Sequence, residues 1–177
     1  MNDHKIVFTG TMGAGKTTAI AAISDTPPVM TDVPNSDPAS GKPMTTVGLD
    51  FGQVQLEGGE QVRLFGTPGQ ERFDFLWRIL ARNAIGVVVL VDNSRPDPLA
   101  DMATYLDAFR AELDVMACVI GVGRTEQHAR PSIDDFVDAL SARGLVLPVL
   151  AVDVRRRDDV LMLLDTLLAQ IEANHAE

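Results

Sequence analysis

The sequence has little positive charge, almost no cysteine and no long apolar run. Its 177 residues carry 15 Lys and Arg against 25 Asp and Glu, a formal net charge of −10. This balance argues against non-specific binding to nucleic acid or to an anionic membrane surface. One cysteine, Cys118, excludes a disulfide framework within the chain, and its apolar neighbours predict a buried, unreactive thiol. No apolar stretch approaches the length of a membrane span.

Targeting signals are also missing. A strand pattern begins almost at the first residue, so we expect no signal peptide. The ends carry neither a myristoylation glycine nor a prenylation box, and the three histidines are scattered. We therefore expect a cytoplasmic protein with no membrane anchor and no histidine metal cluster. The length favours a single domain over residues 1–177.

The most informative stretch is GTMGAGKT at residues 10–17. It follows a predicted strand at 5–9 and precedes a predicted helix at 18–23, the context that a G-x-x-x-x-G-K-[ST] phosphate-binding loop needs. Glycines let backbone N–H groups turn around phosphate oxygens, and the helix N-terminus attracts negative charge. Lys16 is expected to reach the β- and γ-phosphates, and Thr17 to ligate Mg²⁺. The predicted phosphate-binding residues are Gly10, Met12, Gly13, Ala14, Gly15, Lys16, Thr17 and Thr18.

Strand patterns follow a proline-rich stretch. Residues 24–44 hold five of the ten prolines and are expected to form a long loop. Residues 45–57 and 60–65 alternate between apolar and polar positions on either side of Gly58 and Gly59, which predicts a hairpin with a two-glycine turn. The alternation shifts before Val54, so Gly52 is expected to mark a bulge.

Strands and helices alternate over the rest of the chain. Apolar runs at 85–91, 115–122 and 147–152 predict buried parallel strands. Helices are expected over 75–82, from Pro98, from Pro131 to near Gly144, and from about Asp158 onward.

This order of elements predicts an α/β three-layer domain with a mostly parallel, six-stranded sheet and one antiparallel hairpin. Ligands of such sheets bind beyond the carboxyl ends of the strands. One pocket is therefore expected among the loops that follow Thr9, Phe65, Asp92, Val122 and Val152.

Three motifs at these spacings resemble a Ras-superfamily small GTPase, a kind of P-loop NTPase. They are residues 10–17, TVGLDF at 46–51, which is similar to switch I of Rab proteins, and GTPGQERF at 66–73, which is similar to their switch II. The whole chain resembles the bacterial MglA-like group. The resemblance implies a Ras-like fold and a GTP/GDP molecular switch that hydrolyses GTP with Mg²⁺.

The resemblance also implies residue roles. Thr46 would ligate Mg²⁺ and sense the γ-phosphate, Gly69 would contact the γ-phosphate, and Gln70 would orient the attacking water. Lys16 and Gln70 are thus the predicted catalytic residues, although Gln70 can also be interpreted as an exposed loop residue. Loops that contact only the γ-phosphate relax after hydrolysis. Protein partners, among them roadblock/LC7-type regulators, would therefore bind near residues 43–51 and 67–77.

Two positions depart from the family pattern. Gly66 stands where small GTPases usually carry an aspartate that holds a Mg²⁺-bound water, which predicts weaker Mg²⁺ binding. Met12 stands where Ras itself has a glycine. Its bulk is expected near Gln70, and slow intrinsic hydrolysis follows.

The base-binding motif departs further. GRTE at 123–126 takes the place of the family's Asn-Lys-x-Asp. Glu126 is expected to accept the two guanine N–H bonds, and the stem of Arg124 to cover the base; the other interpretation makes both surface charges. Ala151 is the match to the family's last base motif, and Arg155 is a further candidate to reach the base or ribose.

Three functions remain open at this point. The first is the GTP-hydrolysing switch. The second is a pseudo-GTPase interaction module with weak or unselective nucleotide binding. The third is a P-loop kinase or ATPase, which would need an arginine-bearing lid that the sequence does not show. Trp77, within the second switch-like region, is interpreted either as core or as an exposed anchor for a partner.

Overall fold

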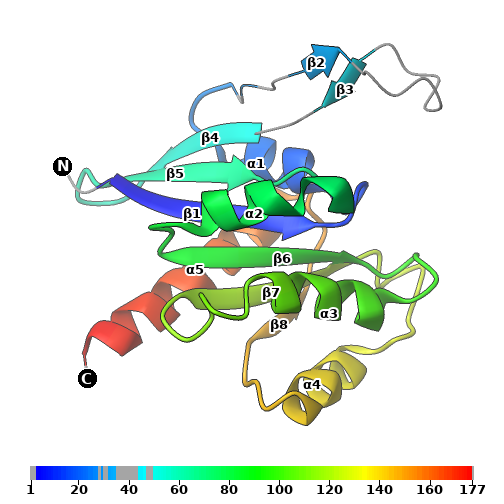
Figure 1. Cartoon of the computed structure of the whole chain (residues 1–177). Coiled ribbons are helices and arrows are strands. Elements are labelled where there is room, and N and C mark those ends of the chain that lie inside the picture. The colour runs from blue at the N-terminus through cyan, green and yellow to red at the C-terminus, as the bar shows by residue number, and fades with distance from the viewer. Residues whose placement is uncertain (1–2, 28, 30–31, 35–43, 47–49, 177) are drawn as a thin grey trace.

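A computed structural model describes residues 3–27, 29, 32–34, 44–46 and 50–176. Within these residues, the main sheet consists of β1 (Asp3–Gly10), β4 (Asp50–Gln55), β5 (Gln61–Gly66), β6 (Gly86–Asp92), β7 (Ala117–Gly123) and β8 (Val149–Ala151). Their order is β4-β5-β1-β6-β7-β8 (Figure 1). The β4–β5 pair is antiparallel and the other four pairs are parallel. The predicted mostly parallel, six-stranded sheet with one antiparallel hairpin is confirmed.

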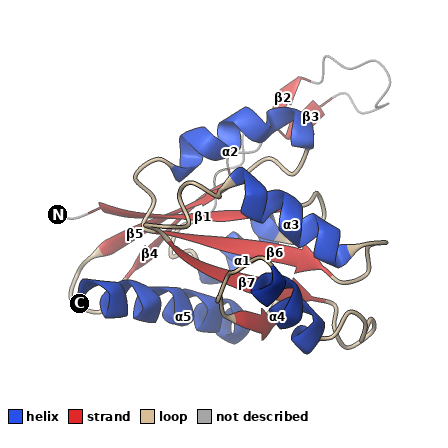
Figure 2. Cartoon of the chain, turned by 60° about the horizontal axis from the view of Figure 1, so that its bottom comes forward, coloured by secondary structure: helices blue, strands red, loops and turns tan. Residues whose placement is uncertain are grey.

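Helices cover both faces of the sheet, so its central strands are apolar on both sides. The helices are α1 (Lys16–Ile23), α2 (Asp74–Ala81), α3 (Pro98–Ala108), α4 (Ile133–Ala142) and α5 (Arg157–His175), with a short 3₁₀ turn, η2 (Glu71–Phe73), before α2. Figure 2 shows α5 on one side of the sheet and α2 and α3 on the other. Apolar residues of α1 and α5 share one core with β1, whereas those of α2, α3 and α4 share a second core across the sheet. Every residue of β6 is buried between the two.

Local sequence explains where the later helices begin. Pro98 is the first residue of α3, and the Asp97 carboxylate accepts a hydrogen bond from the Ala100 N–H. At α4, Ser132 and Asp135 form a capping box, in which each side chain accepts from the other's backbone N–H. Both devices satisfy N–H groups that a helix start otherwise leaves unpaired.

The predicted hairpin forms between β4 and β5, but the predicted bulge at Gly52 is wrong. The antiparallel register runs without interruption along β4. Asp50, Gly52 and Val54 occupy the buried positions. Phe51 points to the other face, where its ring packs edge-on against Phe65 at a centroid distance of 5.2 Å. The apparent shift in alternation arose because a buried position holds an acidic residue instead of an apolar one.

The turn of this hairpin is also longer than predicted. Leu56 N–H donates to the Glu60 carbonyl, so three residues, 57–59, form the turn instead of two. Gly58 and Gly59 both have positive φ values, 104° and 87°, which non-glycine residues adopt only with strain.

The region between α1 and β4 differs from the predicted long loop. Within it, β2 (Asp32–Pro34) pairs antiparallel with β3 (Met44–Thr46) as a separate small sheet. The loop prediction is therefore wrong at β2, and the strand predicted over 45–57 is divided between β3 and β4. Residues 47–49, which belong to the first switch-like motif, lie outside the described residues.

Two predictions about buried side chains are settled. Cys118 is fully buried on β7, as expected, and burial raises the pKa of its thiol to about 12. Trp77 is 1% exposed; its indole N–H donates to the Pro68 carbonyl at 2.7 Å, and its ring packs against Tyr105. The core interpretation of Trp77 is confirmed, and the exposed-anchor interpretation is wrong.

Among the helices of the described ranges, none combines the length and apolar character needed to cross a membrane.

Candidate nucleotide-binding site

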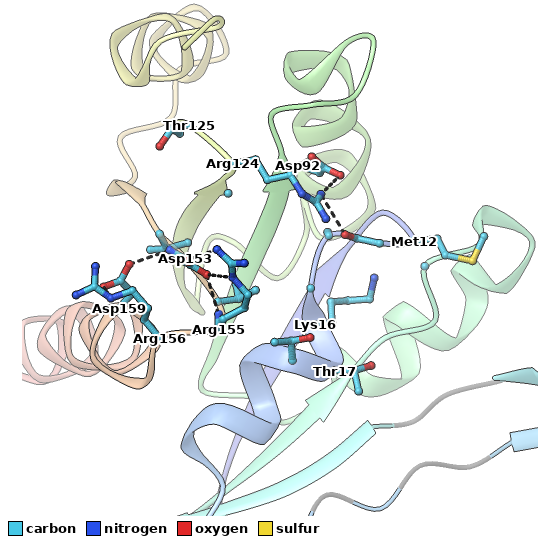
Figure 3. A pocket seen from close by; sticks show the side chains of 18 of the residues that line it. Met12, Lys16, Thr17, Asp92, Arg124, Thr125, Asp153, Arg155, Arg156 and Asp159 are labelled. Carbon is cyan, nitrogen blue, oxygen red and sulfur yellow. Dashed lines mark hydrogen bonds and ion pairs between the residues drawn. The ribbon is translucent and has the colours of Figure 1, made fainter. Parts of the chain in front are cut away.

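A pocket of about 1060 Å³ opens at the carboxyl ends of the strands. Most of its lining residues come from the loops after β1, β5, β7 and β8 and from the last residue of β6 (Figure 3). These are the five places that the sequence predicted to meet. The volume lies just above the range usual for small-molecule sites, roughly 300–1,000 Å³.

The loop between β1 and α1 has the backbone of a phosphate cradle. Gly13 and Gly15 have φ values of 83° and 99°, in the region that favours glycine. A Cβ at Gly15 would lie 2.6 Å from Val154 Cγ2, so the close approach of the loop after β8 also requires glycine there. Gly10 packs behind the loop, where a Cβ would lie 2.3 Å from the Leu90 carbonyl oxygen. Met12, Gly13, Ala14, Gly15, Lys16, Thr17 and Thr18 all line the pocket.

Lys16 is buried at the base of this loop, with 8% of its surface exposed. Its ammonium group donates to the carbonyl oxygens of Gly10 and Thr11 at 2.6 and 2.8 Å. Burial lowers the pKa of Lys16 to about 8, and the nearby Asp50 carboxylate opposes part of this shift. The amine thus lies inside the site and is held by the same loop with which it is expected to bind phosphate.

Thr17 contacts an acidic side chain that the sequence interpretation missed. Its hydroxyl donates to Oδ2 of Asp50 at 2.5 Å, and Asp50 lines the same pocket. Hydroxyl and carboxylate oxygens are the hard ligands that Mg²⁺ prefers, so this donor set fits the ion that the resemblance implies. Thr46, the other predicted Mg²⁺ ligand, ends β3, and its side chain lies outside the described residues.

The loop after β5 lies directly against the phosphate loop. A Cβ at Gly69 would lie 2.5 Å from the Met12 backbone nitrogen and 3.0 Å from Lys16 Nζ, so a larger residue would displace one of these loops. Gln70 accepts a hydrogen bond from Arg72 Nε at 2.6 Å. Its amide nitrogen lies 4.0 Å from the sulfur of Met12, which confirms the expected proximity of these two residues.

Arg124 joins three parts of the pocket wall. It forms an ion pair with Asp92 at the end of β6 and donates to the Gly13 carbonyl at 3.5 Å (Figure 3). Burial by itself raises the pKa of Asp92, but hydrogen bonds from Ser94 and Arg124 outweigh it and leave the pKa below its usual value. Arg124 is therefore not a free surface charge. Glu126 is exposed and also lines the pocket.

The loop after β8 brings a second acidic group to this end of the pocket. Arg155 binds both oxygens of Asp153, at 2.9 and 2.8 Å. These hydrogen bonds lower the pKa of the Asp153 carboxyl to about 2. The Asp153 backbone N–H donates to Asp159 on α5 at 2.8 Å, and Ala151 lines the wall before it. Sequence reasoning missed Asp153, because its only local signal is its place directly after a predicted strand.

Comparisons with known proteins agree with this arrangement. No protein-family model matches the sequence. The chain is 28% identical over 134 residues to the Ras and EF-hand domain-containing protein of Danio rerio, a match that covers 72% of this chain but 18% of that protein. It is 23% identical over 176 residues to the Ras-related protein RabC of Dictyostelium discoideum, covering 96% of this chain and 84% of that protein. This weak homology supports a Ras-like P-loop GTPase. The six-stranded sheet is consistent with that fold, and the similar proteins support a small GTP-binding switch protein.

Proposed function

We propose that the chain is a single G domain over residues 1–177 that alternates between GTP- and GDP-bound forms and hydrolyses GTP slowly. The observation that carries the proposal is the contact between two loops at one amine. Lys16 lies at the base of the phosphate loop, and Gly69 approaches it so closely that a side chain at 69 would reach within 3.0 Å of Nζ. A γ-phosphate bound at Lys16 would therefore contact both loops, and its loss would release one of them.

Different residues of the chain would bind different parts of the nucleotide. The phosphate loop and Lys16 would bind the β- and γ-phosphates, with Thr17 and Thr46 as Mg²⁺ ligands. Bound Mg²⁺ would neutralise the charge that develops on these phosphates. Arg124, Glu126 and Ala151 would surround the base at the other end of the pocket.

The position of Gln70 supports a slow intrinsic rate. Its side-chain oxygen is engaged by Arg72 and its amide lies beside Met12. To orient a water against the γ-phosphate, Gln70 would have to leave the hydrogen bond to Arg72. The free energy needed for this change adds to the barrier.

We expect Gln70→Ala to lower single-turnover GTP hydrolysis by roughly 10²-fold, because one hydrogen-bonding side chain positioned at the transition state contributes about that factor in comparable sites. Gln61→Ala, at an exposed position on β5, is the matched control and should leave the rate unchanged. Equal hydrolysis by wild type and Gln70→Ala, with and without a candidate regulator, would instead favour a pseudo-GTPase module. The Arg72 contact to Gln70 is the observation that favours that second candidate.

Partners would bind over residues 43–51 and 67–77 in the cytoplasm, with roadblock/LC7-type regulators as candidates. Exposed apolar side chains at Phe75 and Ile79 on α2 support a protein contact in the second region. They lie four residues apart and therefore on one face of the helix.

The decisive experiment identifies the nucleotide that the protein binds. Ligand released from purified, denatured protein is separated by anion exchange, and nucleotide-free protein is titrated with GDP, GTP and ATP in Mg²⁺. We expect guanine nucleotide, with ATP at least tenfold weaker. Glu126→Ala should reduce this preference, whereas Glu57→Ala in the hairpin turn should not. Equal affinity for ATP would exclude a GTPase and favour an ATPase or kinase, and absence of binding would leave an interaction module.

A further inference from the structure

We propose that Asp50 supplies the protein carboxylate of the Mg²⁺ site and holds the ion beside Thr17. The inference rests on the proposed function, because the ion would bridge the protein and the nucleotide phosphates. It gives a role to Asp50, an acidic residue within the 46–51 motif that the sequence interpretation left without one.

The Asp50 carboxylate is buried and only partly paired. Asp50 is 4% exposed, and within the described residues its Oδ1 atom has no hydrogen-bond partner. A buried carboxylate is costly unless it is paired or coordinates a metal. The side chain nevertheless lines the pocket, so the carboxylate lies beside the space that a ligand would enter.

The neighbouring cation, the Lys16 ammonium group, hydrogen-bonds to other groups. Lys16 Nζ donates to the Gly10 and Thr11 carbonyl oxygens. Its charge interacts with Asp50 only through space. In the described structure the Asp50 carboxylate therefore accepts from the Thr17 hydroxyl, which carries no charge.

The Thr17 and Asp50 oxygens also lie close enough together to share one ion. Thr17 Oγ1 and Asp50 Oδ2 lie 2.5 Å apart. Neighbouring oxygens of an octahedral Mg²⁺ site with bonds of about 2.0–2.1 Å lie about 3 Å apart. A shift of a few tenths of an ångström would bring these two oxygens to adjacent positions around one ion, either as direct ligands or through a bound water.

The strand register explains why β4 can provide this group. Asp50 lies directly opposite Gly66 at the end of β5. A Cβ at Gly66 would lie 3.0 Å from Asp50 Cβ and 3.1 Å from its Oδ2. Side chains at the two positions would therefore crowd each other, so a carboxylate at 66 would lie beside the place that the Asp50 carboxylate now occupies.

Asp50→Asn tests the inference, because it retains an oxygen that accepts from Thr17 but removes the charge. GDP affinity is measured by calorimetry in Mg²⁺ and in EDTA, and Mn²⁺ bound to the protein–GDP complex is counted by electron paramagnetic resonance. We expect the Mg²⁺-dependent gain in GDP affinity to fall at least tenfold, as is usual when a metal site loses a group that orients or binds the ion. Mn²⁺ binding should weaken in parallel, while GDP affinity in EDTA stays within about threefold.

Two further variants separate a metal role from a structural one. Asp25→Asn removes an exposed carboxylate that accepts a hydrogen bond from the N–H of Gln55, which lies on β4 as Asp50 does. This variant should leave all three measurements unchanged. Asp50→Gly combined with Gly66→Asp moves the charge across the register and should restore Mg²⁺ dependence. Continued loss in this double variant would assign Asp50 to the support of Thr17, against the proposal.

The outcomes also separate this inference from the proposed function. If wild type fails to bind GDP even in Mg²⁺, the proposed nucleotide site is wrong, and the inference is overturned with it. If wild type and Asp50→Asn bind GDP equally and respond equally to Mg²⁺, the nucleotide site stands and only the role of Asp50 is overturned.

Discussion

Lys16 shows how one buried charge links folding to ligand binding. Its ammonium group is surrounded by the loop that it holds, and burial lowers its pKa from 10.5 to about 8. Between these two pH values the unfolded chain binds more protons than the folded one, so this group makes folding more favourable as pH rises. Below about pH 8 the folded, nucleotide-free protein bears the full cost of the buried charge, about 3 kcal/mol.

We therefore expect the stability of nucleotide-free wild type, relative to Lys16→Met, to increase by about 2 kcal/mol between pH 7 and pH 10. The measurement is urea unfolding of both proteins at each pH. Lys5→Met is the control. Because Lys5 is only half-buried, the stability of wild type relative to Lys5→Met should change less between the two pH values. A difference that stays constant with pH would contradict the lowered pKa.

At the scale of single elements, α1 and β4 form the rigid support of the site. The helix begins at Lys16, and β4 begins at Asp50, so the position of one element against the other fixes the Thr17–Asp50 contact. Gly52 sets this position: a Cβ there would lie 2.6 Å from Ile20 Cγ2 on the helix. The glycine that suggested a bulge therefore serves a close helix–strand contact.

Gly52→Ala should push α1 away from β4. We expect a loss of about 1–3 kcal/mol in the free energy of unfolding, as is typical of overpacked cores, together with weaker GDP binding because Lys16 and Thr17 move with the helix. Urea unfolding and calorimetry measure the two effects. Gln55→Ala changes an exposed residue of the same strand and should alter neither. If Gly52→Ala unfolds and binds GDP as wild type does, this contact does not set the position of α1.

At the scale of the whole molecule, parallel strand ends bring five loops to one pocket. The acidic chain, with its net charge of −10, can still offer a phosphate site there, because backbone N–H groups and one buried lysine supply the positive field. Glu126 and Asp153 also line the pocket, in the part where we propose that the base binds.

Much of this arrangement could be predicted from the sequence. An apolar run such as β6 indicates a strand that is buried on both faces of the sheet. The glycine spacing before Lys16 predicts a phosphate-binding loop. Both signals are local, so each is readable without knowing what the segment packs against. The functional roles of Gln70, Thr46 and Glu126 rest on resemblance and remain predictions.

Tertiary structure alone decided the rest. The register of β4 on β5 places Asp50 beside Thr17, and the packing of α2 on α3 buries Trp77. The pairing of β2 with β3 joins segments on either side of residues that carry no strand pattern. In each case the deciding interaction joins residues distant in the chain, and periodicity reports a residue's own exposure but not the identity of its partner.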